Sequence, residues 1–270
     1  MLNIESFIAS FSGKIISLSV HDLKAGREIN IRADHAFHPA STMKVPVMME
    51  VFRQAEIGLL DLNDKLAIQN SFTSVADGSK FSLEEVDDSD KSLYTRLGES
   101  ESIRELTRLM IVRSGNLATN LLLEKVGVKR VNDYLAELGI NGVTIIRGVE
   151  DKAAFRQGLN NSATARGLTH MMRLIAEGRV VTEKASREMV EIMLGQEFKE
   201  SIPALLPKSA RTAHKTGWIA EFYHDTGIVF PVDRQPYAIT ILSHGFPEND
   251  ENQAHSCMAE ISRLVYEEVV

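Results

Sequence analysis

Residues 41–58 read STMKVPVMMEVFRQAEIG, an apolar pattern at helical spacing that ends at a glycine. Proline is tolerated in the first turn of a helix, because the earliest backbone N–H groups have no partner within the helix. Pro46 therefore places the start of this helix close to Ser41. Lys44 follows that serine by three positions, so its amine can reach the serine hydroxyl on one helix face.

Strand and helix patterns continue on either side of this helix. Before it, the chain predicts a short helix and two strands, over 4–11, 15–23 and 27–31. After it, apolar residues at helical spacing predict helices over 102–114, 117–127, 128–139, 164–178 and 182–195. From about Pro207 the chain becomes rich in β-branched and aromatic residues. There we expect three strands and a final helix, over 209–218, 222–232, 235–245 and 252–268.

This order of elements predicts a mixed α/β (α+β) fold. Both ends of the chain contribute to one antiparallel sheet flanked by terminal helices, and an all-helical lobe is inserted between them. We expect residues 1–38 and 205–270 to form the α/β lobe, and residues 39–204 the mostly helical lobe. A cleft between two such lobes is a natural place for an active site.

The composition is that of an ordinary globular protein, with 44% hydrophobic and 25% charged residues. The net charge of −7 gives little support to contacts with a phosphate backbone, so we expect no nucleic-acid partner. Cys257 is the single cysteine, which excludes an internal disulfide. The acidic stretch 84–90 is interpreted as a solvated loop without a functional role.

The first twenty residues lack the basic, apolar and small-residue regions of a secretory signal peptide. No segment has the apolar length of a membrane span. We therefore expect a cytoplasmic protein without a membrane span, or a periplasmic or secreted one if the sequence has been trimmed. We also expect a monomer that acts on a small molecule.

Ser114-Gly115-Asn116 falls where one helical pattern ends and the next begins. The triplet fits a plain turn, in which glycine supplies flexibility and a polar residue starts the next helix. It also fits a catalytic role, with the Ser114 hydroxyl passing a proton to a leaving nitrogen and Asn116 binding a substrate amide. Both interpretations stay open on this triplet alone.

Lys215-Thr216-Gly217 lies on a predicted strand. It fits a solvated strand with a bulge glycine. It also fits an edge strand that binds the backbone of a substrate, with Lys215 attracting a carboxylate and Gly217 permitting a close approach. Ser41 and Lys44 likewise fit a plain helix cap, although theirs is the only Ser-x-x-Lys in the chain.

The three motifs, in this order and at these separations, resemble the Ser-x-x-Lys, Ser-Asp-Asn and Lys-Thr-Gly set of class A β-lactamases and penicillin-binding proteins. The resemblance covers nearly the whole chain, from about Lys14 to the end, and includes the distribution of helices and strands. It implies the β-lactamase/DD-peptidase fold and a covalent acyl-enzyme mechanism.

By this resemblance, Ser41 attacks the carbonyl carbon of the substrate and Lys44 is its base. The backbone N–H groups of Ser41 and Trp218 form the oxyanion hole. Ser114 protonates the leaving nitrogen, assisted electrostatically by Lys215. The residues that position the substrate are Asn116, Thr216 and Gly217.

Two features depart from the family pattern. Gly115 stands where class A enzymes usually carry aspartate, so the local packing must differ. An Ω-like loop over 147–168 carries Glu150 close to where the family has the glutamate that activates the deacylating water. Four residues later stands Ala154 instead of asparagine. Glu150 therefore fits either a general base or an exposed loop carboxylate.

Competing signals are weaker. His35 and His38 are spaced like metal ligands, but no carboxylate or further histidine pattern completes a site. His224-Asp225 suggests part of a serine triad, but the chain has no Gly-x-Ser-x-Gly elbow. We expect no metal and no organic cofactor.

The leading hypothesis is a serine β-lactamase-like hydrolase that opens β-lactam amides through an acyl-enzyme on Ser41. The altered Ω-like loop keeps two alternatives open. One is an esterase or D-alanyl peptidase on the same scaffold, and the other is a penicillin-binding sensor that is acylated without turnover. Glu150 is the residue that discriminates among these hypotheses, because they differ in deacylation.

Overall fold

The computed structural model describes residues 2–232 and 234–268, so residues 1, 233, 269 and 270 of the predicted α/β lobe lie outside the described residues. The chain forms two compact units. The first unit is Met1–Thr42 with Ser162–Val270, and the second is Met43–Asn161. Each unit has its own core and is described by itself.

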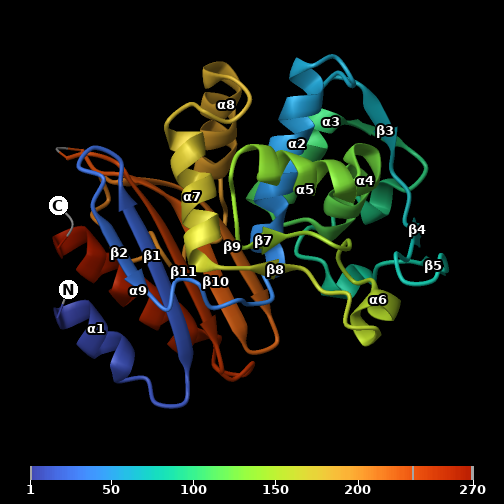
Figure 1. The fold of residues 1–270 in the computed structure, drawn as a ribbon. Helices are drawn as coiled ribbons and strands as arrows, with labels where there is room; N and C mark the ends of the chain where they lie inside the picture. Colours follow the sequence, from blue (N-terminus) through green and yellow to red (C-terminus); the bar gives the residue numbers. More distant parts are fainter. Residues whose placement is uncertain (1, 233, 269–270) are drawn as a thin grey trace. The chain divides into compact units, whose positions relative to one another are not determined.

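The first unit is built on a five-stranded antiparallel sheet with strand order β2-β1-β11-β10-β9 (Figure 1). Its strands are β1 (Ile15–Asp22), β2 (Glu28–Ile31), β9 (Arg211–Ile219), β10 (Phe222–Phe230) and β11 (Tyr237–His244). The order of the strands leaves β9 at one edge. In its register with β10, Thr216 lies opposite Asp225.

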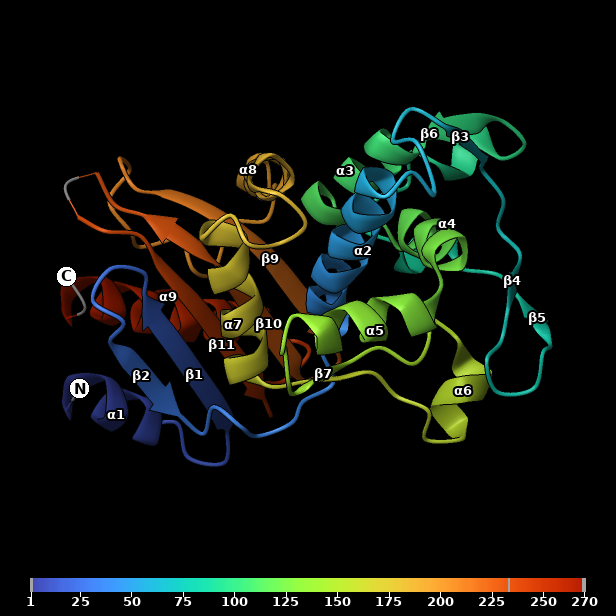
Figure 2. The ribbon, with the colours of Figure 1, turned by 45° about the horizontal axis from the view of Figure 1, so that its top comes forward.

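Helices cover both faces of this sheet (Figures 1 and 2). Helices α1 (Leu2–Ala9) and α9 (Glu251–Glu268) pack on one face, where Ile8, Leu18 and Ile261 share one apolar core. Helix α7 (Ala165–Ala176) packs on the other face against β1 and β11, and α8 (Glu183–Leu194) packs beside it against β9. Burying a large aliphatic side chain contributes about 1.5–3 kcal/mol, so these layers hold the sheet in place.

Helix α2 (Lys44–Glu56) lies at the centre of the second unit. Nearly all of its residues are buried, because helices α3 (Ile103–Val112), α4 (Asn116–Val126) and α5 (Val128–Glu137) pack around it. The chain also forms shorter elements: β3 (Lys65–Ala67), β4 (Phe72–Thr73), β5 (Lys80–Phe81), β6 (Ser100–Ser102), β7 (Val143–Thr144), β8 (Ser162–Ala163), α6 (Lys152–Arg156) and the 3-10 turns η1 (Ala40–Met43), η2 (Glu85–Asp87) and η3 (Tyr94–Arg96).

The predicted mixed α/β fold is confirmed, and the long helices and strands lie within a few residues of their expected positions. Ser102 caps α3, since its hydroxyl accepts from the N–H of Glu105 at 3.2 Å, whereas the Glu105 carboxylate accepts from Arg108. The division of the chain differs from the expected one. Residues 39–42 and 162–204 were expected in the helical lobe but belong to the first unit, because α7 and α8 pack on its sheet.

The prediction for the acidic stretch 84–90 is wrong for two of its residues. Asp88 and Asp90 are only 3% and 5% exposed, whereas Glu84 and Asp87 are exposed as expected. A buried carboxylate is costly unless hydrogen bonds or opposite charges compensate it. Asp88 therefore needs partners, and these partners include residues of the Ser-Gly-Asn motif.

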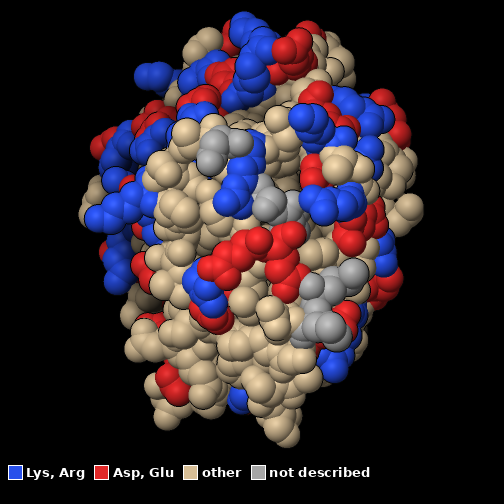
Figure 3. Space-filling model, turned by 90° about the vertical axis from the view of Figure 1, so that its left-hand side faces the viewer, with Lys and Arg blue, Asp and Glu red and all other residues tan. Residues whose placement is uncertain are grey.

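The surface carries charges of both signs. In the space-filling view, Lys and Arg side chains are interspersed with Asp and Glu side chains over the face that is shown (Figure 3). Within residues 2–232 and 234–268, no helix combines the length and the apolar character that a membrane crossing requires.

Candidate active site

Ser41 lies on a short turn that leads directly into α2. The turn is the 3-10 segment η1, and Ser41 itself is partly exposed whereas its neighbours are buried. Ala40, just before it, has a φ of +46°, a left-handed conformation that is unfavourable for a residue with a Cβ atom. The N–H of Ala40 donates to Nδ1 of His38 at 3.1 Å, which helps to hold this conformation. We call residues 38–42 the nucleophile turn.

His224 supports the nucleophile turn from strand β10. Its Nε2 donates to the carbonyl oxygen of His38 at 2.8 Å, and its Nδ1 accepts from the N–H of Ser243 at 3.2 Å. Burial lowers the pKa of His224 to about 4, so the ring is neutral near pH 7. Asp225, the neighbour that suggested a triad, instead binds Nδ1 of His214 at 3.0 Å. His224 is therefore a support for the turn.

The edge strand β9 approaches the nucleophile turn closely, and this is possible only at a glycine. A Cβ atom on Gly217 would lie 2.7 Å from the backbone nitrogen of Ser41 and 3.1 Å from that of Thr42. A contact of 2.7 Å is shorter than real Cβ atoms make, so a side chain here would push β9 and the turn apart. The strand thus places the backbone N–H groups of Ser41 and Trp218 in one region of the first unit, as an oxyanion hole requires.

The other residues of the third motif point to a binding surface on β9. Lys215 is fully buried, and its Nζ donates to the carbonyl oxygen of Thr216 at 2.8 Å. The buried hydroxyl of Thr216 has no hydrogen-bond partner among the residues that the structure describes. A buried hydroxyl without a partner is unfavourable, and a substrate oxygen would satisfy it. Trp218 is 41% exposed.

In the second unit, four polar side chains form what we call the proton-handling cluster: Lys44, Ser114, Asn116 and Glu150. Lys44 is completely buried at the start of α2. Its Nζ donates to the Ser114 carbonyl oxygen at 2.6 Å, to the Ser114 hydroxyl at 3.2 Å, and to Oδ1 of Asn116 at 2.8 Å. The first two motifs thus meet at one amine.

The surroundings of Lys44 make it a base at neutral pH. Burial lowers its pKa to about 7, although the carboxylates of Asp88 and Glu150 act in the opposite direction. A catalytic base works best when its pKa lies near the working pH. A substantial fraction of Lys44 is therefore neutral near pH 7 and able to accept a proton.

Glu150 belongs to the same cluster. Its Oε1 accepts from Nδ2 of Asn116 at 3.1 Å, so the Asn116 amide joins Glu150 to Lys44. Its Oε2 accepts from the N–H of Glu84 at 3.4 Å. Glu150 has a φ of +60° and is half-buried, and burial raises the pKa of its carboxyl. This position beside Asn116 favours the general base over an exposed loop carboxylate.

The Ω-like loop is closed at its neck by backbone and amide contacts. Arg147 donates to the carbonyl oxygen of Leu159 at 3.1 Å and to Oδ1 of Asn160 at 3.2 Å. Oδ1 of Asn161 accepts from the backbone N–H groups of Ile146 and Arg147. These contacts fix where the segment with Glu150 begins and ends.

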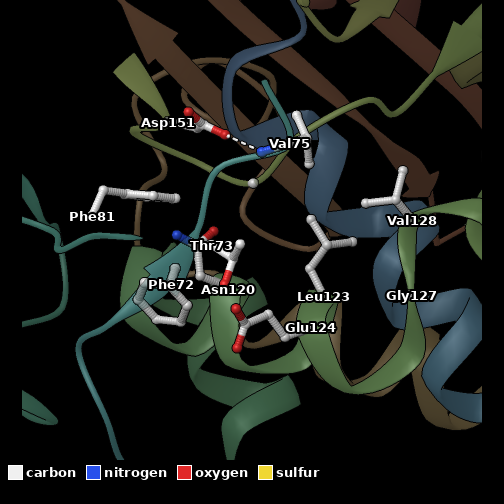
Figure 4. Close-up of a pocket in the computed structure, with 11 residues that line it drawn as sticks. Phe72, Thr73, Val75, Phe81, Asn120, Leu123, Glu124, Gly127, Val128 and Asp151 are labelled. Carbon is white, nitrogen blue, oxygen red and sulfur yellow. Dashed lines mark hydrogen bonds between the residues drawn. The ribbon is translucent and has the colours of Figure 1, made fainter. Parts of the chain in front are cut away.

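Asp151 fixes the loop immediately after Glu150. It is 2% exposed, and its carboxylate accepts from the Ser74 hydroxyl at 2.8 Å and from the N–H of Val75 at 3.0 Å (Figure 4). It also caps α6 by accepting from the N–H of Ala154 at 2.9 Å, and the methyl side chain of that alanine offers no amide to hold a water. Figure 4 shows Asp151 among the residues that line a cavity of about 200 Å³ in this unit.

Each predicted site residue therefore lies in one of two groups. Ser41 and the β9 residues 215–218 are in the first unit, and the proton-handling cluster is in the second unit. The sequence analysis missed His224 as a support and Asp88 as a charge near Lys44. A serine on a turn with backbone donors, and a lysine with a pKa of about 7 bonded to a second serine, are the groups that an acyl-transferring serine hydrolase requires.

Known proteins agree with this class. The model of the β-lactamase enzyme family matches residues 2–269. β-Lactamase BRO-1 of Moraxella catarrhalis is 22% identical over 241 residues, covering 87% of this chain and 74% of the relative. The structure of PBP-A matches with a TM-score of 0.83 at 23% identity, covering 98% of this chain and 94% of that chain. A variant of the last common ancestor of Gram-negative class A β-lactamases matches with a TM-score of 0.84 at 21% identity, covering 98% and 96%.

The chain belongs to the β-lactamase enzyme family. The family resemblance, the fold and the class of β-lactamase-like serine hydrolase that the sequence predicts are thereby confirmed.

Proposed function

We propose that this protein opens β-lactam amides through an acyl-enzyme on Ser41, with the nucleophile turn and the proton-handling cluster both acting on the substrate. The observation that carries the proposal is the state of Lys44. Three residues after Ser41 stands a fully buried amine whose pKa lies at about 7 and which is bonded to Ser114 and Asn116.

Acylation follows from these groups. Neutral Lys44 takes the hydroxyl proton of Ser41, whose Oγ forms a bond to the carbonyl carbon. The N–H groups of Ser41 and Trp218 stabilise the negative charge on the carbonyl oxygen. When the C–N bond breaks, Ser114 gives its proton to the nitrogen. The protonated Lys44 returns a proton to the Ser114 oxygen along their 3.2 Å contact, which restores both groups.

Deacylation is assigned to Glu150. Its carboxylate takes a proton from a water molecule as the water oxygen bonds to the ester carbon. The bond from that carbon to Oγ of Ser41 then breaks, and the proton held by Glu150 passes to Oγ, which restores both the hydroxyl and the carboxylate. Because burial raises the pKa of Glu150, the carboxylate is a stronger base than an exposed glutamate. Its contact with Asn116 keeps it in the cluster that also handles the acylation proton.

The test follows a chromogenic cephalosporin with the parent protein and with Ser41→Ala. We expect product well beyond one equivalent of enzyme in the parent and none above background in Ser41→Ala. Mass spectrometry of the quenched parent should show a covalent adduct on the peptide that contains Ser41. Turnover that persists in Ser41→Ala would refute the assignment of the nucleophile.

A second candidate is acylation with slow turnover, as in a penicillin-binding protein. It is favoured by Ala154, which provides no side-chain amide to hold a water beside Glu150. Glu150→Gln separates the two candidates. If the protein is a β-lactamase, this variant accumulates acyl-enzyme while its acylation rate is nearly unchanged. If the parent already stops after releasing about one equivalent of product per enzyme, the protein is a penicillin-binding protein that is acylated without turnover. Cleavage of short acyl esters or D-alanyl peptides by the parent would instead indicate an esterase or peptidase.

A further inference from the structure

We propose that Asp88 is a positioning residue for acylation: it anchors the Ser-Gly-Asn motif at the start of α4 and sets the charge balance at the amine of Lys44. The inference rests on the proposed function, because it concerns the base of that reaction. It concerns a carboxylate outside the three motifs, within the stretch 84–90 that the sequence presents as a solvated loop.

The contacts of Asp88 converge on the beginning of α4. Its Oδ1 accepts from the N–H of Asn116 at 2.8 Å, and its Oδ2 accepts from the N–H of Leu117 at 2.9 Å. The Tyr94 hydroxyl also donates to Oδ2 at 2.9 Å. The first N–H groups of a helix have no partner within the helix. Asp88 therefore satisfies two of them from a distant segment and fixes the backbone of the residue whose amide binds Lys44.

Gly115 explains why the carboxylate must come from elsewhere. It is the N-cap residue of α4, where an aspartate, asparagine or serine side chain would ordinarily accept from the helix N–H groups. Its φ of −59° and ψ of 122° are open to any residue, so the backbone conformation does not require glycine. The space is tight, because a Cβ atom on Gly115 would lie 3.3 Å from Cβ of Asp90, which would have to shift by a few tenths of an ångström. The segment with Asp88 and Asp90 thus occupies the place of the missing side chain.

Asp88 is also one of two carboxylates that act on Lys44. Asp88, from the segment before η3, and Glu150, from the Ω-like loop, both raise the pKa of Lys44. The groups that bind the amine directly, on Ser114 and Asn116, are uncharged. Burial alone would lower the pKa of Lys44 further. Asp88 therefore opposes the burial, and its removal must leave Lys44 a weaker base that loses its proton at lower pH.

The pH dependence of the acylation rate shows in which direction Asp88 shifts the pKa of Lys44. Lys44 must be neutral to accept the proton of Ser41, so the acylation rate falls as the pH drops through the pKa of Lys44. Without the charge of Asp88 that pKa is lower, and the acid limb of the rate profile moves to lower pH. A residue that served only as a helix cap would reduce the rate or the stability but would leave the acid limb in place.

The experiment compares Asp88→Asn with the parent by stopped-flow acylation at a series of pH values. We expect the acid limb to move to lower pH and the plateau rate to fall on the order of 10-fold, because the anchor of Asn116 is weakened. Glu85→Gln removes an exposed carboxylate from the same stretch and should leave both quantities unchanged. Asp88→Glu keeps the charge and should keep the acid limb of the parent. An unmoved acid limb in folded Asp88→Asn would overturn the proposal.

A second measurement keeps the inference testable if no β-lactam is turned over. NMR titration of the Lys44 side chain in Ser41→Ala reports its pKa without catalysis. The same titration in Ser41→Ala with Asp88→Asn should give a lower pKa for Lys44, and equal values would overturn the inference.

If Asp88→Asn does not fold, Tyr94→Phe removes one donor to the carboxylate. It should then move the acid limb to higher pH, because the Asp88 carboxylate without this hydrogen bond attracts the protonated amine of Lys44 more strongly. An acid limb that stays at the pH of the parent would count against the proposal.

Discussion

The nucleophile turn and the proton-handling cluster contribute to catalysis by different physical means. The turn relies on the backbone, with a left-handed residue before the serine and a glycine that lets β9 approach to within contact of Ser41. The cluster relies on side-chain charge: hydrogen bonds through Asn116 join Lys44 to Glu150, and burial lowers the pKa of Lys44 and raises that of Glu150. Added atoms should therefore impair the turn, and changed charges should impair the cluster.

Replacing the base should give the largest effect. Lys44→Met keeps the length of the side chain but removes the amine, and we expect the acylation rate to fall on the order of 10³-fold. Because the pKa of Lys44 is about 7, the acid limb of the parent near that pH should disappear in the variant. Stopped-flow acylation across the pH range measures both quantities, with circular dichroism to verify folding. A surviving acid limb near pH 7 would assign that titration to another group.

Adding one methyl group to β9 should give the next largest effect, and without any change in pH dependence. In Gly217→Ala the new Cβ would lie 2.7 Å from the Ser41 nitrogen, so the strand and the turn must separate. Loss of one oxyanion donor costs about 10²–10³-fold, and we expect a fall in kcat/KM of that order. Ile219→Ala, at an exposed position of the same strand, is the matched control. A shifted acid limb in Gly217→Ala would contradict the division between backbone and charge.

Much of the turn could be predicted from sequence because its signals are local. Pro46 marks the first turn of α2, and the three-residue spacing of Ser41 and Lys44 is independent of the rest of the fold. The strands and helices were predictable for the same reason, since the spacing of apolar residues that predicts them involves only residues close in sequence. The lobe boundary was not predictable, because the apolar stripe of α7 does not say which surface it will cover.

The supports of the site could not be predicted, because each depends on a contact between distant segments. His224 reaches His38 across 186 positions, and Asp88 reaches Asn116 across 28. An acidic stretch is more often solvated than buried, so the composition of residues 84–90 predicted an exposed Asp88 without a role in the site. Gly115 was the one available signal: a helix start without a capping side chain leaves N–H groups that some other residue has to satisfy.

Releasing the Ω-like loop should have a smaller effect, confined to deacylation and stability. Asp151→Ala removes the acceptor of the Ser74 hydroxyl and the Val75 N–H, and we expect a loss of unfolding free energy of about 2–3 kcal/mol. Deacylation should slow on the order of 10-fold, because Glu150 is the preceding residue, while acylation stays near the parent rate. Denaturant unfolding and single-turnover kinetics measure the two effects. The control is Asp77→Ala, which removes an exposed carboxylate from the neighbouring loop.

The smallest effect on activity is expected at His224, where the backbone turn and a titrating group meet. Its pKa of about 4 in the folded protein, against 6.5 as the ordinary value, means that the unfolded chain binds the proton more readily. The stability that comes from keeping this ring neutral is fully present above about pH 6.5 and is lost as the pH falls toward 4, by about 3 kcal/mol in total. His224→Gln retains an N–H donor for His38 but cannot titrate. Its unfolding free energy should therefore fall less steeply than that of the parent over this pH range, with acylation near neutral pH changed only a few-fold. Equal slopes in His224→Gln and the parent would show that His224 does not make this contribution.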